Sequence, residues 1–332
     1  MDKFLTWVER TTEKRLTLRK ARRAYAKNKK RTFLSEALEW LDALVFGVFW
    51  VLILNQFLFQ LFLIPSPSME NTLLVKDRVV VFKDQYGVEV YPAGPKVLDE
   101  NRRVQRDDII TFYNPEYDSK GPFFDILSQV IYMGTLSLVN IDRNEDGTPA
   151  ERLYVKRAAA LGGDSVRFVD GNVEIKASGM GEWMEEDEFR TLNGLSSGPH
   201  RLVEEEYYPG LKAAARMTAL SEAGIALPSY LQEDYEIIGV TNWDYKVDLY
   251  EYNREYAKTQ CEIDPTSLSA RSSYSVYDSG IYVPYSYVLP LGDNRDNSQD
   301  GRYFGPVSES DVNGRVVARF WPFGRIGILT EE

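Results

Sequence analysis

Hydrophobic and polar positions divide the chain into one long apolar stretch near its start and a larger part with short alternating runs. Residues 43–64 are apolar apart from Asn55, Gln56 and Gln60 and a single glycine. A helix of this length would cover about 33 Å, which is close to the thickness of one bilayer core. The pattern predicts a transmembrane helix. Asn55 and Gln56 near mid-bilayer indicate either a helix partner or tolerated polarity.

Beyond this stretch, short runs rich in Val, Ile, Tyr and Phe alternate with Gly, Pro, Asn and Asp. Such runs are typical of half-buried strands bounded by turns. We expect strands at 78–82, 108–113, 153–159, 165–169, 173–175, 281–291 and 315–321. The prediction is a mainly β protein, with an antiparallel β domain on an N-terminal transmembrane helix. No internal repeat is evident.

Two regions depart from this pattern. Residues 123–139 are apolar but short for a membrane span, so they form either a core element or a surface hairpin or helix that dips into the bilayer. Residues 177–278 contain acidic clusters, many tyrosines and a helical pattern at 211–223 that ends at Gly224. We interpret this region as an inserted accessory domain of mixed α/β structure.

Charge is distributed unevenly along the chain. The net charge is −11, yet residues 1–31 carry twelve Lys or Arg and three Asp or Glu. These residues form either a basic amphipathic helix near anionic headgroups or a solvated tail. The positive-inside rule places this end in the cytoplasm and the chain after Ile64 outside. A cleaved signal peptide is the alternative, but the apolar run exceeds the roughly 7 to 15 residues of a signal core, so we favour a retained anchor.

These patterns give five expected segments. They are a basic cytoplasmic segment at 1–40, a membrane anchor at 41–64, the first part of the β domain at 65–176, the insert at 177–278 and the last part of the β domain at 279–332.

The residues that usually bind metals or form disulfides are scarce. Cys261 is the single cysteine, so no intramolecular disulfide can form, and the single histidine, His200, has no metal-ligand spacing around it. The run that starts at Asp142 begins like a calcium loop, but its twelfth position is Leu153 instead of the bidentate glutamate. We expect no metal, no cofactor and no nucleic-acid partner.

Three separated segments carry the candidate chemistry. The first is 64–74, where Ser66 and Ser68 stand among prolines that favour a stiff, extended backbone. The second is 154–164, a strand with Lys156 among apolar neighbours, and the third is the polar loop 292–303. Taken singly, they could be a linker, a strand with a surface lysine and an Asx-rich turn.

Together, the three segments resemble the bacterial type I signal peptidases, membrane-anchored Ser/Lys proteases that remove signal peptides from exported proteins. The resemblance covers roughly 40–176 and 280–325, in the same order and at the same distance from the anchor. It departs at Asn71, where the family usually has proline, at Asp107, where it has glycine, and at Gly162, where Leu-Pro-Gly-Asp is usual. These departures affect turns.

The resemblance implies a role for each matching residue. Ser68 is the expected nucleophile and Lys156 the general base, while the Ser68 N–H and the Ser66 hydroxyl form the oxyanion hole. Ser298 is expected to orient the lysine amine. Paired charges that hold the loop, each worth little if exposed, are expected at Asp293, Arg295, Asp300 and Arg302. The apolar neighbours of Lys156 favour the base assignment, because a lysine accepts a proton near neutral pH only when its pKa is lowered, and burial among apolar groups can lower it.

The function implied is a serine endopeptidase that cleaves signal peptides from preproteins with small residues before the cut. The lipid bilayer and the export translocon are the other expected partners, and the location is the inner or cytoplasmic membrane, with a single span and the catalytic domain outside. Two alternatives remain: a Ser/Lys protease with one dedicated client, and an inactive homologue that acts as a scaffold of the secretion machinery.

Overall fold

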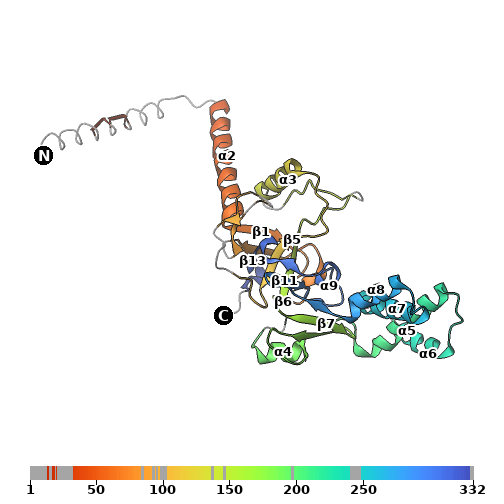
Figure 1. The fold of residues 1–332 in the computed structure, drawn as a ribbon. Helices are drawn as coiled ribbons and strands as arrows, with labels where there is room; N and C mark the ends of the chain where they lie inside the picture. The colour runs from red at the N-terminus through yellow and green to blue at the C-terminus, as the bar shows by residue number, and fades with distance from the viewer. Residues whose placement is uncertain are drawn as a thin grey trace. The chain divides into compact units, whose positions relative to one another are not determined.

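A computed structural model describes most of the chain after the first thirty-two residues (Figure 1). The described residues are 13–14, 17–18, 20, 33–83, 86–91, 94, 96–97, 103–135, 138–144, 147–195, 198–239 and 248–329. The expected basic helix over 1–31 lies almost wholly outside them. The chain divides into two compact units, Met1–Trp50 and Val51–Glu332, and the second contains the predicted insert. The five expected segment boundaries stay predictions.

The apolar stretch begins as helix α2, Phe33–Phe57. Within the described residues, its part Glu36–Phe57 is long and apolar enough to cross a membrane. The expected continuation of the helix to residue 64 is wrong, because strand β1, Phe59–Leu63, follows directly. Backbone pairing of β1 along all of β2, Arg78–Phe82, and burial of Phe62 favour the strand over more helix.

Asn55 and Gln56, near the end of α2, form hydrogen bonds with residues of the strands that follow. Asn55 is buried; its amide donates to the carbonyl oxygen of Val51 at 2.9 Å, and its Oδ1 accepts from the Leu61 N–H at 3.4 Å. The Gln56 amide donates to the carbonyl oxygen of Glu89 at 2.9 Å. These two side chains therefore join the end of α2 to the chain that follows, instead of lying at mid-helix.

The main sheet of the described residues has eight strands in the order β1-β2-β13-β5-β6-β11-β12, with β14 paired to β13. All of its pairings are antiparallel, and the sheet curls around buried side chains (Figure 1). The strands not yet bounded are β5 Ile109–Tyr113, β6 Leu153–Leu161, β11 Tyr287–Leu291, β12 Val307–Ser308, β13 Val312–Trp321 and β14 Gly327–Ile328. The expected antiparallel β fold is confirmed.

Two smaller sheets accompany the main one. One has the order β10-β7-β8-β9, and the other pairs β3 with β4. Their strands are β3 Val88–Glu89, β4 Lys96–Val97, β7 Ser165–Val169, β8 Asn172–Lys176, β9 Met184–Glu185 and β10 Ile281–Tyr282. The single strand expected over 281–291 is wrong: the chain turns between β10 and β11, where Ser286 has a φ of 66° and the Tyr287 N–H bonds the Pro284 carbonyl.

Helix α3, Pro122–Gly134, is the region expected as a core element or a surface element. It is a surface helix: Phe123 is 82% exposed, whereas Ser128, Gln129 and Met133 are buried. The Arg152 guanidinium holds it by donating to the backbone and side chain of Asp125 at 2.7 and 2.9 Å. Contact of α3 with lipid stays a prediction.

The insert is mostly helical (Figure 1). It contains β9, α4 Glu186–Leu192, η3 Glu205–Tyr207, α5 Tyr208–Glu222, α6 Ser229–Gly239, α7 Leu249–Ile263 and α8 Leu268–Asp278. The expected helix at 211–223 is α5. The later helices were not expected, although Asp248 and Ser267 cap α7 and α8 by accepting backbone N–H bonds. The remaining short helices are η1 Pro67–Met69, α9 Gly301–Phe304, η4 Glu309–Asp311 and η5 Phe323–Arg325.

Candidate active site

Ser66 and Ser68 lie on the loop that joins β1 to β2, residues 64–77, here called the serine loop. Two backbone hydrogen bonds close it, from the Ile64 N–H to the Asp77 carbonyl and from the Lys76 N–H to the Ile64 carbonyl, both at 2.9 Å. Met69 and Leu73 anchor it in the core, where both are fully buried. Ser68 sits in the short helix η1, so its backbone is fixed from both sides.

Lys156 projects from β6 toward this loop. It pairs in register with Ile110 of β5, and its side chain is buried, with a relative exposure of 3%. Its Nζ lies 2.6 Å from the Oγ of Ser68, which is itself 7% exposed. The Ser66 Oγ lies 3.3 Å from the Ser68 Oγ. The structure therefore brings together the three residues that the sequence placed on two distant segments.

Burial lowers the pKa of Lys156 to about 8, because desolvation disfavours the ammonium form. The negative charges of Asp300 and Glu151 oppose this effect, and the positive charge of Arg302 adds to it. The lysine is therefore neutral in a substantial fraction of molecules at mildly alkaline pH. A neutral amine beside a hydroxyl can accept its proton, which is the chemical requirement for a base.

The third segment, residues 292–303, follows β11 and packs on the serine loop; we call it the polar loop. The Asn294 N–H donates to the carbonyl oxygen of Ser68 at 3.1 Å, and the Asn294 amide donates to that of Pro67 at 3.3 Å. The Gly292 N–H donates to Asp300 Oδ2 at 2.9 Å. The polar loop thus holds the backbone of the proposed nucleophile directly.

Asp300 and Arg302 form the expected pair, with Nε–Oδ1 and Nη2–Oδ2 distances of 2.9 and 3.1 Å. Asp300 is fully buried. Burial alone would raise the pKa of Asp300, but Arg302 and the Gly292 N–H lower it overall, so the carboxylate stays charged. The pair is therefore buried, so the small stabilisation expected of an exposed ion pair does not apply to it.

Asp293 and Arg295 are also buried, and their ion-pair partners lie outside the polar loop. Asp293 accepts two hydrogen bonds from Arg157, from Nε and from Nη2, both at 2.7 Å. Arg295 donates from Nε to Glu186 of the insert at 3.0 Å. These two residues therefore connect the polar loop to β6 and to α4, and not to each other.

Ser298 lies beside this site, but its hydroxyl makes no hydrogen bond to another residue in the part of the chain that the structure describes. The oxygen is nevertheless buried, and it would contact a Cβ placed on Gly292. Its expected role in orienting Lys156 stays a prediction.

Several residues around the site were not expected from the sequence to take part in it. Arg157, Asp107, Glu186 and Arg190 form buried ion pairs there, and the backbone of His200 bonds the polar loop. The His200 N–H donates to the Asp293 carbonyl at 2.8 Å. A local signal for these ion pairs was the spacing of Glu186 and Arg190, four residues apart on α4, but such pairs usually lie on a solvated helix surface.

A cleft of about 1560 Å³ lies next to the site. The cleft is lined by Leu63 and Pro65 before the two serines, by Leu153 and Tyr154 of β6, and elsewhere by residues of α3 and its flanking loops. Gln60 also lines it, and neither polar atom of its buried amide has a partner among the described residues. The cleft therefore offers both apolar contacts and an amide that has no partner among the described residues.

Several known proteins are similar in sequence to this chain. A signal peptidase I of Haemophilus influenzae is 27% identical over 300 residues, which are 88% of this chain and 74% of that protein. One from Buchnera aphidicola is 23% identical over 301 residues, covering 90% and 79%. The mouse mitochondrial inner membrane protease subunit 1 is 35% identical over 70 residues, covering 21% and 42%. The model of the signal peptidase, peptidase S26 family matches residues 37–321, and the chain therefore belongs to that family.

Proposed function

We propose that this protein is a membrane-anchored serine endopeptidase that removes signal peptides from preproteins, with Ser68 and Lys156 as its catalytic dyad. The observation that carries the proposal is the 2.6 Å distance between Lys156 Nζ and Ser68 Oγ at a buried site. A serine hydroxyl is a weak nucleophile until a base takes its proton, and no histidine side chain bonds Ser68 among the described residues.

In the first step, neutral Lys156 accepts the Ser68 proton while Ser68 Oγ attacks the carbonyl carbon of the scissile bond. The carbonyl oxygen becomes an oxyanion, which the Ser68 N–H and the Ser66 hydroxyl stabilise. This N–H bonds no other described residue, and the hydroxyl lies 3.3 Å from Ser68 Oγ. Donors aimed at the developing charge strengthen as the reaction proceeds, so they lower the barrier.

In the second step, the Lys156 ammonium returns the proton to the leaving amine, and the mature protein departs. The signal peptide is then an ester on Ser68. Neutral Lys156 takes a proton from a water molecule, the hydroxide attacks the ester carbonyl, and Ser68 recovers its proton as the carboxylate leaves. One lysine thus serves as base and acid in each half of the reaction.

The preprotein binds as an added strand along β6. Residues 153–156 of β6 pair with β5 along one edge. Strand β11 pairs with the other edge of β6 only from Arg157 onward, so none of the described strands occupies that edge at residues 153–156. Backbone hydrogen bonds to such an edge supply affinity, and side-chain pockets supply specificity. Small residues at the first and third positions before the cut fit shallow pockets between Pro65 and Tyr154, beside the cleft.

The anchor and the charge pattern give the location. The single apolar helix of the described residues is the membrane anchor, and the basic residues before it stay in the cytoplasm. The catalytic unit then lies on the outer face of the inner or cytoplasmic membrane, where signal peptides emerge. The bilayer and the export translocon are its expected partners.

The test uses the full chain in detergent micelles or vesicles and a preprotein with an Ala-x-Ala cleavage site. Wild-type protein should release the mature product, and its new N-terminus should follow the second alanine. Ser68→Ala and Lys156→Ala should both be inert, whereas Ser269→Ala on the exposed part of α8 should be fully active. Equal activity of wild type and both site variants would rule out the dyad.

A further inference from the structure

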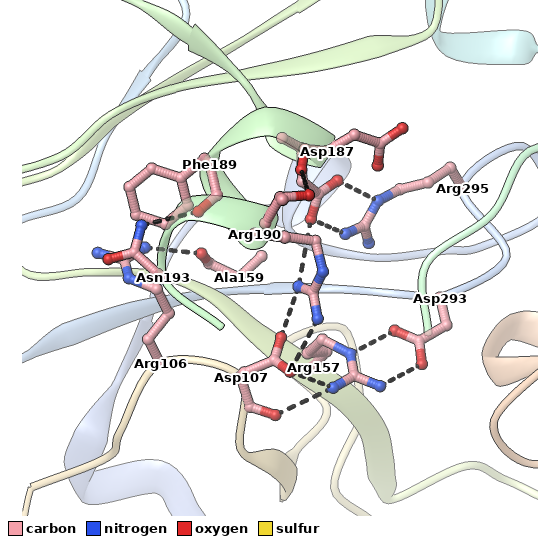
Figure 2. Close-up of polar contacts among 12 residues, drawn as sticks. Arg106, Asp107, Arg157, Ala159, Asp187, Phe189, Arg190, Asn193, Asp293 and Arg295 are labelled. Carbon is pink, nitrogen blue, oxygen red and sulfur yellow. Dashed lines mark hydrogen bonds and ion pairs between the residues drawn. The ribbon is translucent and has the colours of Figure 1, made fainter. Parts of the chain in front are cut away.

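Six buried charges near the proposed active site form a chain of ion pairs, and Figure 2 shows Asp293, Arg157, Asp107, Arg190 and Arg295 of this chain. We call it the charge chain, and it runs in the order Asp293, Arg157, Asp107, Arg190, Glu186 and Arg295. Three arginines and three carboxylates alternate, so the chain is neutral as a whole. It begins and ends on the polar loop, and its middle passes through β6, the turn before β5 and helix α4 of the insert.

Every link of the charge chain except the Arg190–Glu186 link is a close contact. Arg157 Nη1 donates to Asp107 Oδ2 at 2.8 Å, and Arg190 Nη2 donates to the same oxygen at 2.8 Å. Arg190 Nη1 lies 3.8 Å from Glu186 Oε1, and Glu186 accepts from both Nε and Nη2 of Arg295. Since all six side chains are buried, removal of one charge takes an ion pair from its neighbours that solvent does not replace.

Asp107 stands in a conformation that a side chain rarely adopts, with a φ of 75°. This left-handed backbone costs a non-glycine residue about 1 kcal/mol or more, and glycine would adopt it freely. The carboxylate offsets that cost by linking Arg157 of the catalytic strand to Arg190 of the insert. The costly backbone conformation of Asp107 indicates that its link between the two arginines contributes to the structure of the site.

A second part of the insert, residues 198–203, lies against the other side of the same loop. The Arg295 N–H donates to the His200 carbonyl at 3.0 Å, and the N–H groups of Leu202 and Val203 donate to Asp296 Oδ2 at 2.6 and 2.8 Å. A Cβ on Gly198 would lie 2.5 Å from Arg157 Nη2. The insert therefore contacts the polar loop both through side chains and through backbone.

We propose that Arg190 and Glu186 of the insert are positioning residues of the protease, which act through the polar loop on Ser68. This inference rests on the proposed function. Arg190 holds Arg157 against Asp293 through Asp107, and Glu186 holds Arg295. The polar loop so fixed presents the Asn294 N–H to the Ser68 carbonyl, which sets the position of Ser68 Oγ relative to Lys156.

The test compares kcat and KM for cleavage of the Ala-x-Ala preprotein by full-length variants. Arg190→Met should lower kcat by at least about tenfold, because it removes the ion pair that Arg190 makes with the buried Asp107. KM should stay within about twofold, because the open edge of β6 is untouched. Arg190→Lys keeps the charge but loses the paired geometry of the guanidinium, so its kcat should lie between those of wild type and Arg190→Met.

A compensating change separates positioning from simple stabilisation. Asp107→Asn combined with Arg190→Met leaves the neutral pairs Arg157–Asp293 and Arg295–Glu186. Asparagine also tolerates the left-handed backbone at 107. The kcat of the double variant should be at least about fivefold higher than that of Arg190→Met. Removal of both members of a buried ion pair destabilises a site less than removal of one member.

The matched control is Arg216→Met, which breaks the Arg216–Glu255 pair between α5 and α7 at 2.6 Å. It should lower the melting temperature slightly and leave kcat unchanged. If Arg190→Met does not fold, the isosteric Glu186→Gln takes its place, with the same expected loss in kcat. Folding of each variant is checked by near-UV circular dichroism.

Wild-type kcat in a folded Arg190→Met or Glu186→Gln variant would overturn the proposal, provided that Ser68→Ala is inert. Failure of the double variant to recover activity would also count against it. If instead Ser68→Ala cleaves as well as wild type, the proposed dyad is wrong and the positioning role falls with it. The two failures are thus distinguished by the Ser68→Ala measurement.

Discussion

The α-carbon of Gly292 packs directly against the carbonyl oxygen of Ser68: a Cβ on Gly292 would lie 2.6 Å from that oxygen and would also strike the Ser298 side chain. The absence of a side chain at 292 is what allows the polar loop to approach the serine loop closely. Backbone of the serine loop must shift if this space is filled, because a carbonyl oxygen cannot rotate away as a flexible side chain can.

Gly292→Ala should therefore displace Ser68 relative to Lys156 and lower kcat by about a hundredfold, since a misplacement near 1 Å can cost that much. The measurement is steady-state cleavage of the Ala-x-Ala preprotein. Gly181→Ala is the control, because a Cβ at this exposed insert position meets nothing within 4 Å. Equal kcat for the two variants would contradict the close packing inferred at Gly292.

The pKa of Lys156 sets the acid side of the pH profile. Because burial lowers this pKa to about 8, Lys156 is protonated at lower pH and cannot accept the Ser68 proton. The value of kcat/KM should rise with pH, reach half its maximum near pH 8 and fall by about tenfold for each unit below that. A flat profile between pH 6 and about 9 would contradict a lysine base.

Lys83 provides the control for this profile. It too is buried, and desolvation lowers its pKa to about 8. No contact joins Lys83 to Ser66 or Ser68 among the described residues. Lys83→Met should therefore leave the midpoint of the profile in place. A shift of the midpoint in Lys83→Met would mean that the pH profile reports the titration of Lys83 and not that of Lys156.

Much of the fold could be predicted from alternation alone. Strands β2 and β7 begin and end at the expected residues, because each has one buried face and turn residues at both ends. The end of α2 could not be predicted, since β1 continues the same apolar run and only its pairing with β2 makes it a strand. A change of secondary structure inside one apolar run leaves no local signal.

The candidate site divides in the same way. Ser68 and Lys156 could be proposed because their short segments carry the resemblance to signal peptidases. The partners of Asp293 and Arg295 could not, because Arg157 and Glu186 lie more than a hundred residues away along the chain. An acidic cluster such as 185–188 usually forms a solvated surface, and only the folded structure reveals that Glu186 is buried.

Lys156→Met should abolish cleavage and at the same time stabilise the protein at neutral pH. A lysine pKa lowered from 10.5 to about 8 costs the folded state about 3 kcal/mol at pH 7, because the unfolded chain binds a proton that the folded site resists. Loss of the contact with Ser68 returns about 1 kcal/mol of that gain. The melting temperature at pH 7 should therefore rise.

The sign of this effect can be checked with pH. The cost is fully present below pH 8 and disappears as the pH rises toward 10.5, where the unfolded lysine also loses its proton. The difference in melting temperature between Lys156→Met and wild type should shrink over that range. Lys176→Met, at a partly exposed position of β8, is the control variant. A constant difference would mean that packing, and not the buried amine, determines the gain.

Ser66→Ala should lower kcat by about 10² to 10³ if its hydroxyl stabilises the oxyanion, with little change in KM. Ser66→Thr keeps the hydroxyl and should retain more activity. Ser269→Ala is a matched control, since its Oγ also lies close to that of a serine two residues away, Ser267, but on the surface. Full activity of Ser66→Ala would remove this residue from the oxyanion hole.

Among the carboxylates that raise the pKa of Lys156, Asp300 and Glu151 have the largest effects and should therefore tune the pH profile. Asp300 is the stronger of the two and is buried; Glu151 is exposed. Asp300→Asn removes a negative charge and leaves the positive charge of Arg302 unopposed, so both effects lower the lysine pKa and move the acid limb toward lower pH. Its maximal rate should also fall, because the Asp300–Arg302 pair fixes the polar loop.

Glu151→Gln isolates the electrostatic part of this prediction. Its side chain carries no ion pair among the described residues, so the variant should fold and turn over normally while its acid limb moves in the same direction, by less than in Asp300→Asn. High salt should erase the Glu151→Gln shift, since solvent screens an exposed charge, and should leave the shift of the buried Asp300→Asn largely intact. Opposite directions in the two variants would contradict the assignment of Lys156 as the titrating base.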